Sequence, residues 1–293
     1  MFNTIEEYLE ALKLEMKDAD PALVQDAQAD AREHLSFALA GAKETSPQTS
    51  DAEALKKIIE EYGTPQETAS AYKEVERRTS PVLQAALKPR SIVGRFFGVY
   101  TDSRAWGALL YMLIAFVTGI FYFTWAVTGV SVSIPFLIFI FGFPFALLFL
   151  LSVRGLALLE GRLVEALLGV RMPRRPLFSH ADMKWFDRLK ALLMDKATWL
   201  MLVYMLIQFV LGIAYFVAIV TVLSVSLAFM SLPFIQLFTD VPVFNWNGPV
   251  HLPYWQLVLL SIAGFLAWTS FMHIARGVGQ LHGKMAKWLL VTE

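Results

Sequence analysis

The chain has 293 residues, of which 56% are hydrophobic, and its 25 lysines and arginines balance its 25 acids. Soluble domains are about 45–50% apolar, so this composition excludes an ordinary, wholly soluble chain. Because there is no cysteine, a disulfide framework and a thiol nucleophile are excluded as well.

The overall neutrality hides two unlike parts. Residues 1–87 carry 17 acids and 9 bases, whereas residues 88–293 carry 8 acids and 16 bases. The acidic start of the chain lacks the basic and apolar regions of a signal peptide. We therefore expect an acidic soluble domain followed by a basic, apolar membrane domain.

Three Ser/Thr-x-x-Glu capping boxes mark helix starts in the acidic part, at Thr4, Ser50 and Thr64. In a capping box the hydroxyl accepts a free backbone N–H and the glutamate returns the bond. A fourth helix is expected to begin after Asp20, because proline is favoured at the first helical position. The predicted helices cover residues 4–18, 21–40, 50–62 and 64–78, and they form a small bundle within residues 1–80.

A linker or interfacial segment, residues 81–101, leads to four apolar stretches, and a spanning helix needs about 20 such residues. The stretches cover residues 107–128, 134–153, 199–222 and 255–275. None has a charged side chain in its interior, where one charge costs about 2.5–3.5 kcal/mol on insertion scales. The predicted fold class is therefore all-α, with residues 102–293 forming a four-span transmembrane domain.

The lysines and arginines predict the orientation of these spans. All 16 bases of the second part lie before span one, between spans two and three, or after span four. The positive-inside rule makes that side cytoplasmic. We therefore expect a multi-pass membrane protein with both termini in the cytoplasm.

The segment from Asp102 to Phe123 recurs from Asp195 to Phe216, with 13 of 22 positions identical. Both copies start on the same side of the membrane, which predicts two parallel repeats. Gly119 and Gly212 recur at the same place in the two copies. Small residues let spanning helices approach closely, so we predict that both glycines pack against neighbouring helices.

The segments after spans two and four also align, with Arg154 opposite Arg276. The first of them is amphipathic, with Leu163 on its apolar face and Glu160 away from that face. Such a helix either lies in the plane of the lipid headgroups or caps the bundle, and both alternatives stay open.

Three arginines, Arg171, Arg174 and Arg175, lie next to the membrane in the stretch GVRMPRRP. They either serve as topological charge or contact anionic lipids. The chain has no HExxH, no GxSxG and no phosphate loop. We therefore expect no enzymatic activity, no cofactor and no metal.

Both parts resemble known bacterial families. Residues 1–80 resemble the HAAS domain, a small helical signalling module, through Tyr8, Leu9, Leu12, the stretch Arg32 to Leu35, the stretch Glu61 to Pro65, and Ala69. Residues 93–290 resemble the bacterial "putative sensor" transmembrane domain through LALLEGRLVEALLGVRMP and the apolar stretch that follows Asp195. The resemblance implies a bacterial inner membrane and, for residues 1–80, a PadR-like transcriptional regulator as partner.

These observations favour a non-enzymatic membrane sensor or regulatory protein that signals through residues 1–80. Its expected partners are the lipid bilayer and the regulator, with a homo-oligomer left open and no direct contact with nucleic acid. The alternatives are a small transporter or permease component and a structural assembly factor. Spans without charges argue against ion coupling.

Overall fold

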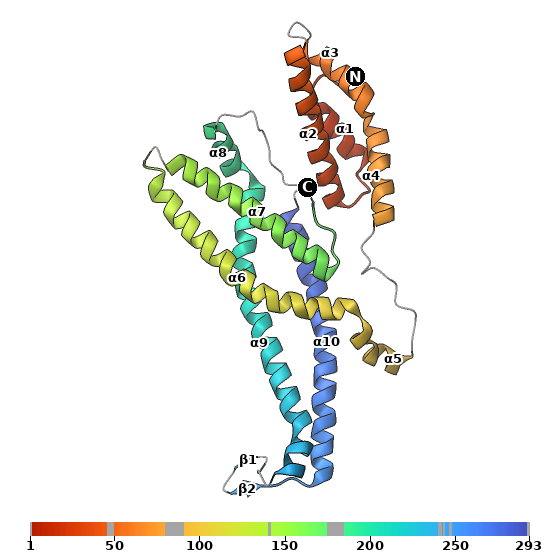
Figure 1. Ribbon diagram of the computed structural model, residues 1–293, viewed down its shortest axis with the longest axis vertical. Helices are drawn as coiled ribbons and strands as arrows, with labels where there is room; N and C mark the ends of the chain where they lie inside the picture. Colours follow the sequence, from red (N-terminus) through yellow and green to blue (C-terminus); the bar gives the residue numbers. More distant parts are fainter. Residues whose placement is uncertain are drawn as a thin grey trace.

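The computed structural model of the protein describes residues 2–45, 50–79, 91–139, 142–174, 185–239, 242, 244–245 and 248–291. Within these residues the fold is all-α, apart from an antiparallel pair of two-residue strands, β1 (Phe244–Asn245) and β2 (Pro249–Val250). A helical N-terminal region precedes four long apolar helices (Figure 1). The predicted fold class is confirmed.

The N-terminal region consists of α1 (Ile5–Glu15), α2 (Pro21–Thr45), α3 (Asp51–Tyr62) and α4 (Pro65–Thr79). The predicted caps are confirmed, because the hydroxyls of Thr4, Ser50 and Thr64 each accept the backbone N–H three residues later. At the start of α4 the capping box closes, since the backbone N–H of Thr64 donates to Glu67 Oε2 at 2.8 Å.

Tyr8 ties this small bundle together. Its ring is fully buried, and its hydroxyl donates to the carbonyl of Gly63 at 2.9 Å and lies 3.0 Å from Thr68 Oγ1. Gly63 has a φ of 112°, which glycine adopts without a steric cost. Nearby, the ring of His34 stacks on that of Tyr62, with the centroids 4.6 Å apart.

Four helices are long and apolar enough to cross a membrane: α6 (Ser103–Phe136), α7 (Gly142–Leu168), α9 (Lys196–Phe238) and α10 (Tyr254–Leu290). Each is longer than the predicted span, and the segments expected to follow spans two and four continue α7 and α10 without a break. Their inward-facing residues, such as Val164 and Ala286, are fully buried. The extensions therefore pack against other helices of the protein.

Among the described residues, three shorter helices connect these elements. They are α5 (Ile92–Phe97), the 3₁₀ helix η2 (Gly98–Thr101) and α8 (Trp185–Met194). Phe97 and Tyr100 stack on Phe265 of α10, each at 5.9 Å between ring centroids. The described end of the predicted linker is thus helical and packs on α10, and residues 80–90 lie outside the described residues.

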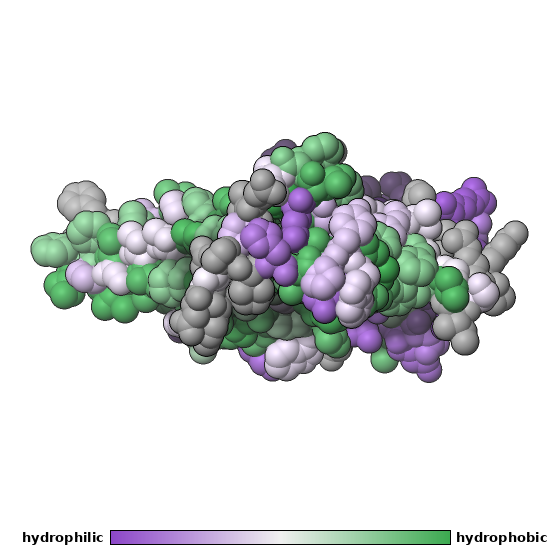
Figure 2. All heavy atoms as spheres, turned by 90° about the horizontal axis from the view of Figure 1, so that it is seen from below, coloured by the Kyte–Doolittle hydropathy of each residue, from purple (hydrophilic) through white to green (hydrophobic). Residues whose placement is uncertain are grey.

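The long helices form two hairpins, α6 with α7 and α9 with α10, which cross where α6 packs against α9 (Figure 1). Exposed apolar side chains such as Val117, Val210 and Leu259 cover the outward faces of the helices. Seen from below, the side of the α6–α7 tip is mainly hydrophobic and hydrophilic clusters lie on the opposite side (Figure 2). A surface of this kind suits contact with lipid.

Candidate functional site

Where the four long helices converge, seven polar side chains form what we call the buried polar network. Its members are Tyr111 and Tyr122 on α6, Glu160 on α7, Tyr204, Gln208 and Tyr215 on α9, and His282 on α10. Glu160 is 1% exposed and His282 is 3% exposed. Burial of such groups is costly unless they are hydrogen-bonded, so their partners decide whether the arrangement is stable.

The carboxylate of Glu160 accepts hydrogen bonds from three tyrosine hydroxyls. Its Oε1 accepts from Tyr111 at 2.5 Å and from Tyr204 at 2.9 Å, and its Oε2 accepts from Tyr122 at 3.0 Å. Nε2 of Gln208 also donates to Oε1, at 3.3 Å. Donors from α6 and α9 therefore surround a carboxylate that belongs to α7.

The imidazole of His282 completes the network from α10. Its Nε2 lies 2.6 Å from the hydroxyl of Tyr111 and 3.1 Å from that of Tyr204, while its Nδ1 lies 3.0 Å from the hydroxyl of Tyr215. Because Tyr111 and Tyr204 direct their protons to Glu160, their oxygens accept from the ring. The ring proton of His282 is therefore assigned to Nε2, and Nδ1 accepts from the hydroxyl of Tyr215.

The network joins residues that hold matching places in the recurring sequence. The corresponding pairs are Tyr111 with Tyr204, Tyr122 with Tyr215, and Glu160 with His282. A tyrosine bonded to a carboxylate in the first half thus matches a tyrosine bonded to an imidazole in the second half. The carboxylate of Glu160 only accepts hydrogen bonds, whereas the ring of His282 at the matching place both donates and accepts. Hydrogen bonds can therefore form between the two halves.

Two ion pairs cross between the hairpins at the starts of α6 and α9. Arg154 of α7 pairs with Asp195, and Arg276 of α10 pairs with Asp102 at 2.9 Å. Each aspartate also accepts the backbone N–H two residues later and so caps the start of its helix. Each hairpin is therefore linked by charge to the first turn of the other.

Gly119 and Gly212 lie where α6 and α9 cross. A Cβ added at Gly119 would lie 2.7 Å from the carbonyl oxygen of Gln208, and one added at Gly212 would lie 2.3 Å from that of Ala115. Stacked rings flank the crossing in two pairs, Phe116 with Phe216 and Phe123 with Phe209. Both glycines thus face the backbone of a neighbouring helix.

Of the three membrane-proximal arginines, Arg171 is 7% exposed and lies between the membrane helices and the N-terminal region. It donates to Asp26 at 2.9 Å and to Glu76 at 3.1 Å. The backbone N–H of Arg174 donates to the same Asp26 carboxylate at 2.6 Å. Arg175 lies outside the described residues. Carboxylates of α2 and α4 therefore engage Arg171, and lipid contact by the cluster stays a prediction.

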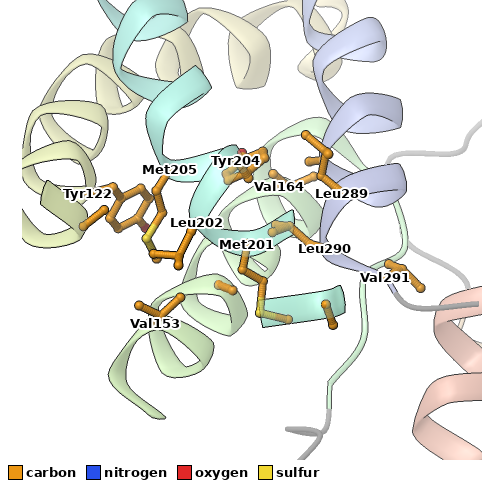
Figure 3. Close-up of a cluster of buried hydrophobic side chains, with 14 of the residues drawn as sticks. Tyr122, Val153, Val164, Met201, Leu202, Tyr204, Met205, Leu289, Leu290 and Val291 are labelled. Carbon is orange, nitrogen blue, oxygen red and sulfur yellow. The ribbon is translucent and has the colours of Figure 1, made fainter. Parts of the chain in front are cut away.

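A hydrophobic layer lies between the buried polar network and the N-terminal region. Its labelled members in Figure 3 include Val164, Met201, Leu289 and Leu290. Ala22 of α2 belongs to the same buried cluster, and just before α2 Asp20 pairs with Lys287 of α10. The N-terminal region is thus docked by apolar contact and by charge.

The sequence analysis did not find the buried polar network. Glu160 lies away from the apolar face that Leu163 marks, as expected, yet it is 1% exposed, because hydroxyl donors from α6 and α9 make burial of the carboxylate acceptable. The available signal was the register of Arg154 on Arg276, which places Glu160 opposite His282.

Four long apolar helices, a buried polar network at their convergence and a docked helical region define a multi-pass membrane protein with four candidate spans. The chain belongs to the family described as "Putative sensor", whose model matches residues 111–290. That range contains every member of the buried polar network. No curated protein and no solved structure matches the chain.

Proposed function

We propose that this protein is a non-enzymatic sensor or regulatory protein of a bacterial inner membrane, with both termini in the cytoplasm. In this proposal, a change in the four-helix domain alters what residues 1–80 bind. The observation that carries the proposal is the buried ion pair of Arg171 with Asp26. Arg171 lies within the range of the sensor family and Asp26 lies in the N-terminal region, so the pair joins the two parts.

A continuous set of contacts leads from the buried polar network to that ion pair. Gly161 follows Glu160, and a Cβ added at Gly161 would lie 3.5 Å from the Cβ of Met172. Met172 is fully buried and is the next residue after Arg171. A displacement of α7 around Glu160 would therefore move the segment that carries Arg171.

The position of Arg171 makes the docking sensitive to small displacements. Its guanidinium lies within 4 Å of three carboxylates, those of Asp26, Glu76 and Glu165. Loss of one partner from a buried ion pair costs about 3–5 kcal/mol, and the cost is smaller here because Glu76 and Glu165 remain beside Arg171. A shift of the segment that breaks the contact with Asp26 would therefore favour release of the N-terminal region.

The resemblance of residues 1–80 to the HAAS domain supports a PadR-like transcriptional regulator as the partner. Residues 1–87 carry 17 acids and 9 bases, and this balance disfavours direct contact with the phosphates of nucleic acid. Phe37 on α2 is 83% exposed and Leu14 on α1 is 71% exposed. These side chains offer apolar contact to a protein partner.

One observation favours a second candidate function, a small transporter or permease component. Glu160 is the 19th residue of α7, about 27 Å along the helix axis from its start. That distance still lies within a hydrocarbon core about 30 Å thick, near its cytoplasmic boundary. Ionisable groups within spans mark ion and proton pathways. The absence of charges from the predicted spans therefore argues less strongly against ion coupling.

The proposed transmission of a displacement from Glu160 to the contact of Arg171 with Asp26, which we call the relay, is tested on the full chain in lipid nanodiscs. Because the chain has no native cysteine, spin labels at Phe37→Cys and Lys190→Cys report the distance between α2 and α8. We expect one narrow distance distribution, which Arg171→Ala and Glu160→Gln both broaden. The control is Leu159→Ala on α7, since that side chain is 52% exposed. An unchanged distribution in both test variants would exclude the relay.

The output and the competing function need separate measurements. Purified PadR-like regulator from the same genome is added to the nanodisc protein, and we expect Arg171→Ala to change its affinity at least threefold. If the regulator binds neither the wild-type protein nor Arg171→Ala, it is excluded as the partner. A proton flux in proteoliposomes that Glu160→Gln abolishes would favour the transporter.

A further inference from the structure

A cavity lies beside the start of α6, apart from the buried polar network. Its volume is about 200 Å³. The polar side chains that line it are Arg104, Arg276, Gln280 and Lys284, and the main chain around residue 169 forms part of its wall. The cavity thus gathers side chains from the first turn of α6 and the last part of α10.

The charge of this cavity is positive. Three of its four polar side chains are bases, and no acid lines it. Arg276 pairs with Asp102, which is 6% exposed. The buried carboxylate therefore balances the charge of Arg276. Among the described residues, the ammonium group of Lys284 has neither a hydrogen bond nor an ion pair. The lining therefore keeps positive charge that a ligand can use.

The position of the cavity along α6 suits a lipid headgroup. Arg104 lies two residues before Trp106, which is 50% exposed and whose indole N–H donates to the carbonyl of Tyr100 at 2.9 Å. Exposed tryptophans of spanning helices mark the boundary between hydrocarbon and headgroups. The guanidinium of Arg104 is thus at the level where lipid phosphates lie.

A matching cavity in the other half of the membrane domain shows what distinguishes this one. It lies beside Arg154, which corresponds to Arg276, and its volume is only about 20 Å³. It is lined by Gln25 of α2 and by Met172, which follows α7. Leu158 takes the place that Gln280 has in the cavity beside Arg104. The docked N-terminal region therefore narrows one cavity, while its counterpart stays open and basic.

We propose that the cavity of Arg104, Arg276 and Lys284 binds a phosphate group, carried by an anionic lipid headgroup or by a free phosphate. Arginine presents a planar fork that matches phosphate oxygens, and lysine adds a compact charge. Basic pockets between spanning helices on the cytoplasmic side bind lipid headgroups in the same way. The proposal does not depend on the relay to the N-terminal region, because it concerns the membrane helices alone.

The test measures ligand binding to the purified full chain in a neutral detergent. Three probes are titrated: short-chain phosphatidylglycerol, short-chain phosphatidylcholine and inorganic phosphate. We expect the anionic lipid to bind at least tenfold more tightly to the wild-type protein than to Arg104→Gln/Lys284→Gln. Lys284→Gln alone should weaken binding at least threefold, and it replaces the double variant if that variant does not fold.

The matched control is Arg162→Gln, because Arg162 corresponds to Lys284 in the other half and donates to the carbonyl of Arg174. Its affinity for each probe should stay within twofold of wild type. Competition by inorganic phosphate at millimolar concentration identifies a free phosphate as the source, and binding of phosphatidylglycerol alone identifies a headgroup. Absence of saturable binding by all three probes, or equal losses in the control and in Lys284→Gln, overturns the proposal.

Discussion

Tyr111 donates its hydroxyl proton to Glu160 over 2.5 Å, and the same oxygen lies 2.6 Å from Nε2 of His282. One hydroxyl of α6 thus connects a carboxylate of α7 with an imidazole of α10. Nothing in the hydropathy of these helices requires the contact, since a hydrophobic core would satisfy the membrane equally. The buried polar network therefore links all four long helices by hydrogen bonds.

Glu160→Gln should destabilise the protein, because the amide group has one acceptor oxygen where the carboxylate has two. At least one tyrosine hydroxyl then faces an NH₂ group and loses its acceptor, which costs about 1–3 kcal/mol. Unfolding of the full chain in mixed detergent micelles measures this loss. Arg162→Gln on the same helix, at an exposed position, should change the free energy of unfolding by less than about 0.5 kcal/mol. Equal losses in the two variants would contradict a special role for the network.

Gly119→Ala and Gly212→Ala should each destabilise the crossing of α6 and α9. The added Cβ would meet a backbone carbonyl at 2.7 Å or 2.3 Å, and a helix backbone cannot move without separating the helices. Overpacking of this kind costs about 1–3 kcal/mol.

The glycine prediction has an internal control on the same chain. Gly155 and Gly277 correspond to each other in the recurring sequence, and a Cβ added at either would have no heavy atom within 4 Å. Alanine there should leave stability unchanged or raise it by up to about 1 kcal/mol, because alanine is the better helix former. Thermal unfolding in detergent of all four variants decides the matter, and uniform shifts would refute the crossing contact.

The N-terminal region should lose stability at alkaline pH. Burial raises the pKa of the Tyr62 hydroxyl to about 12 from its ordinary value of 10.0, so the folded state resists loss of that proton. The contribution of Tyr62 is fully present below pH 10 and is lost as the pH rises towards 12. The loss is at most about 2 kcal/mol by about pH 11.5, and solvent screening of the half-buried hydroxyl reduces it. Urea unfolding of wild type and Tyr62→Phe at several pH values measures this, and the variant should show the smaller decline.

The predicted topology can be tested with reporter fusions. Fusions at the C-terminus and within the α9–α10 loop, at residue 247, should report the cytoplasm and the exterior, respectively. The expectation rests on the 16 bases of residues 88–293, which all lie on one side of the four spans. A C-terminal fusion that reports the exterior would exclude the four-span arrangement.

Local rules were enough for much of the fold. The capping boxes predicted the starts of α1, α3 and α4, because a cap depends on residues three positions apart. Apolar length predicted the four long helices. The predicted start of the second span, at residue 134, is wrong, because α6 continues to Phe136 and α7 begins at Gly142. Both sides of that turn are apolar, so hydropathy alone does not locate it.

The sequence by itself determined the all-α class, the four apolar helices, the helix caps and the recurrence of Gly119 and Gly212. Only the tertiary structure decided that Glu160 is buried, that Arg171 joins two regions and that one basic cavity stays open. The physical reason is the distance along the chain between partners. Tyr111 and His282 are 171 positions apart, and Arg171 and Asp26 are 145 apart. A polar side chain is buried or exposed according to donors and acceptors that the fold brings from elsewhere.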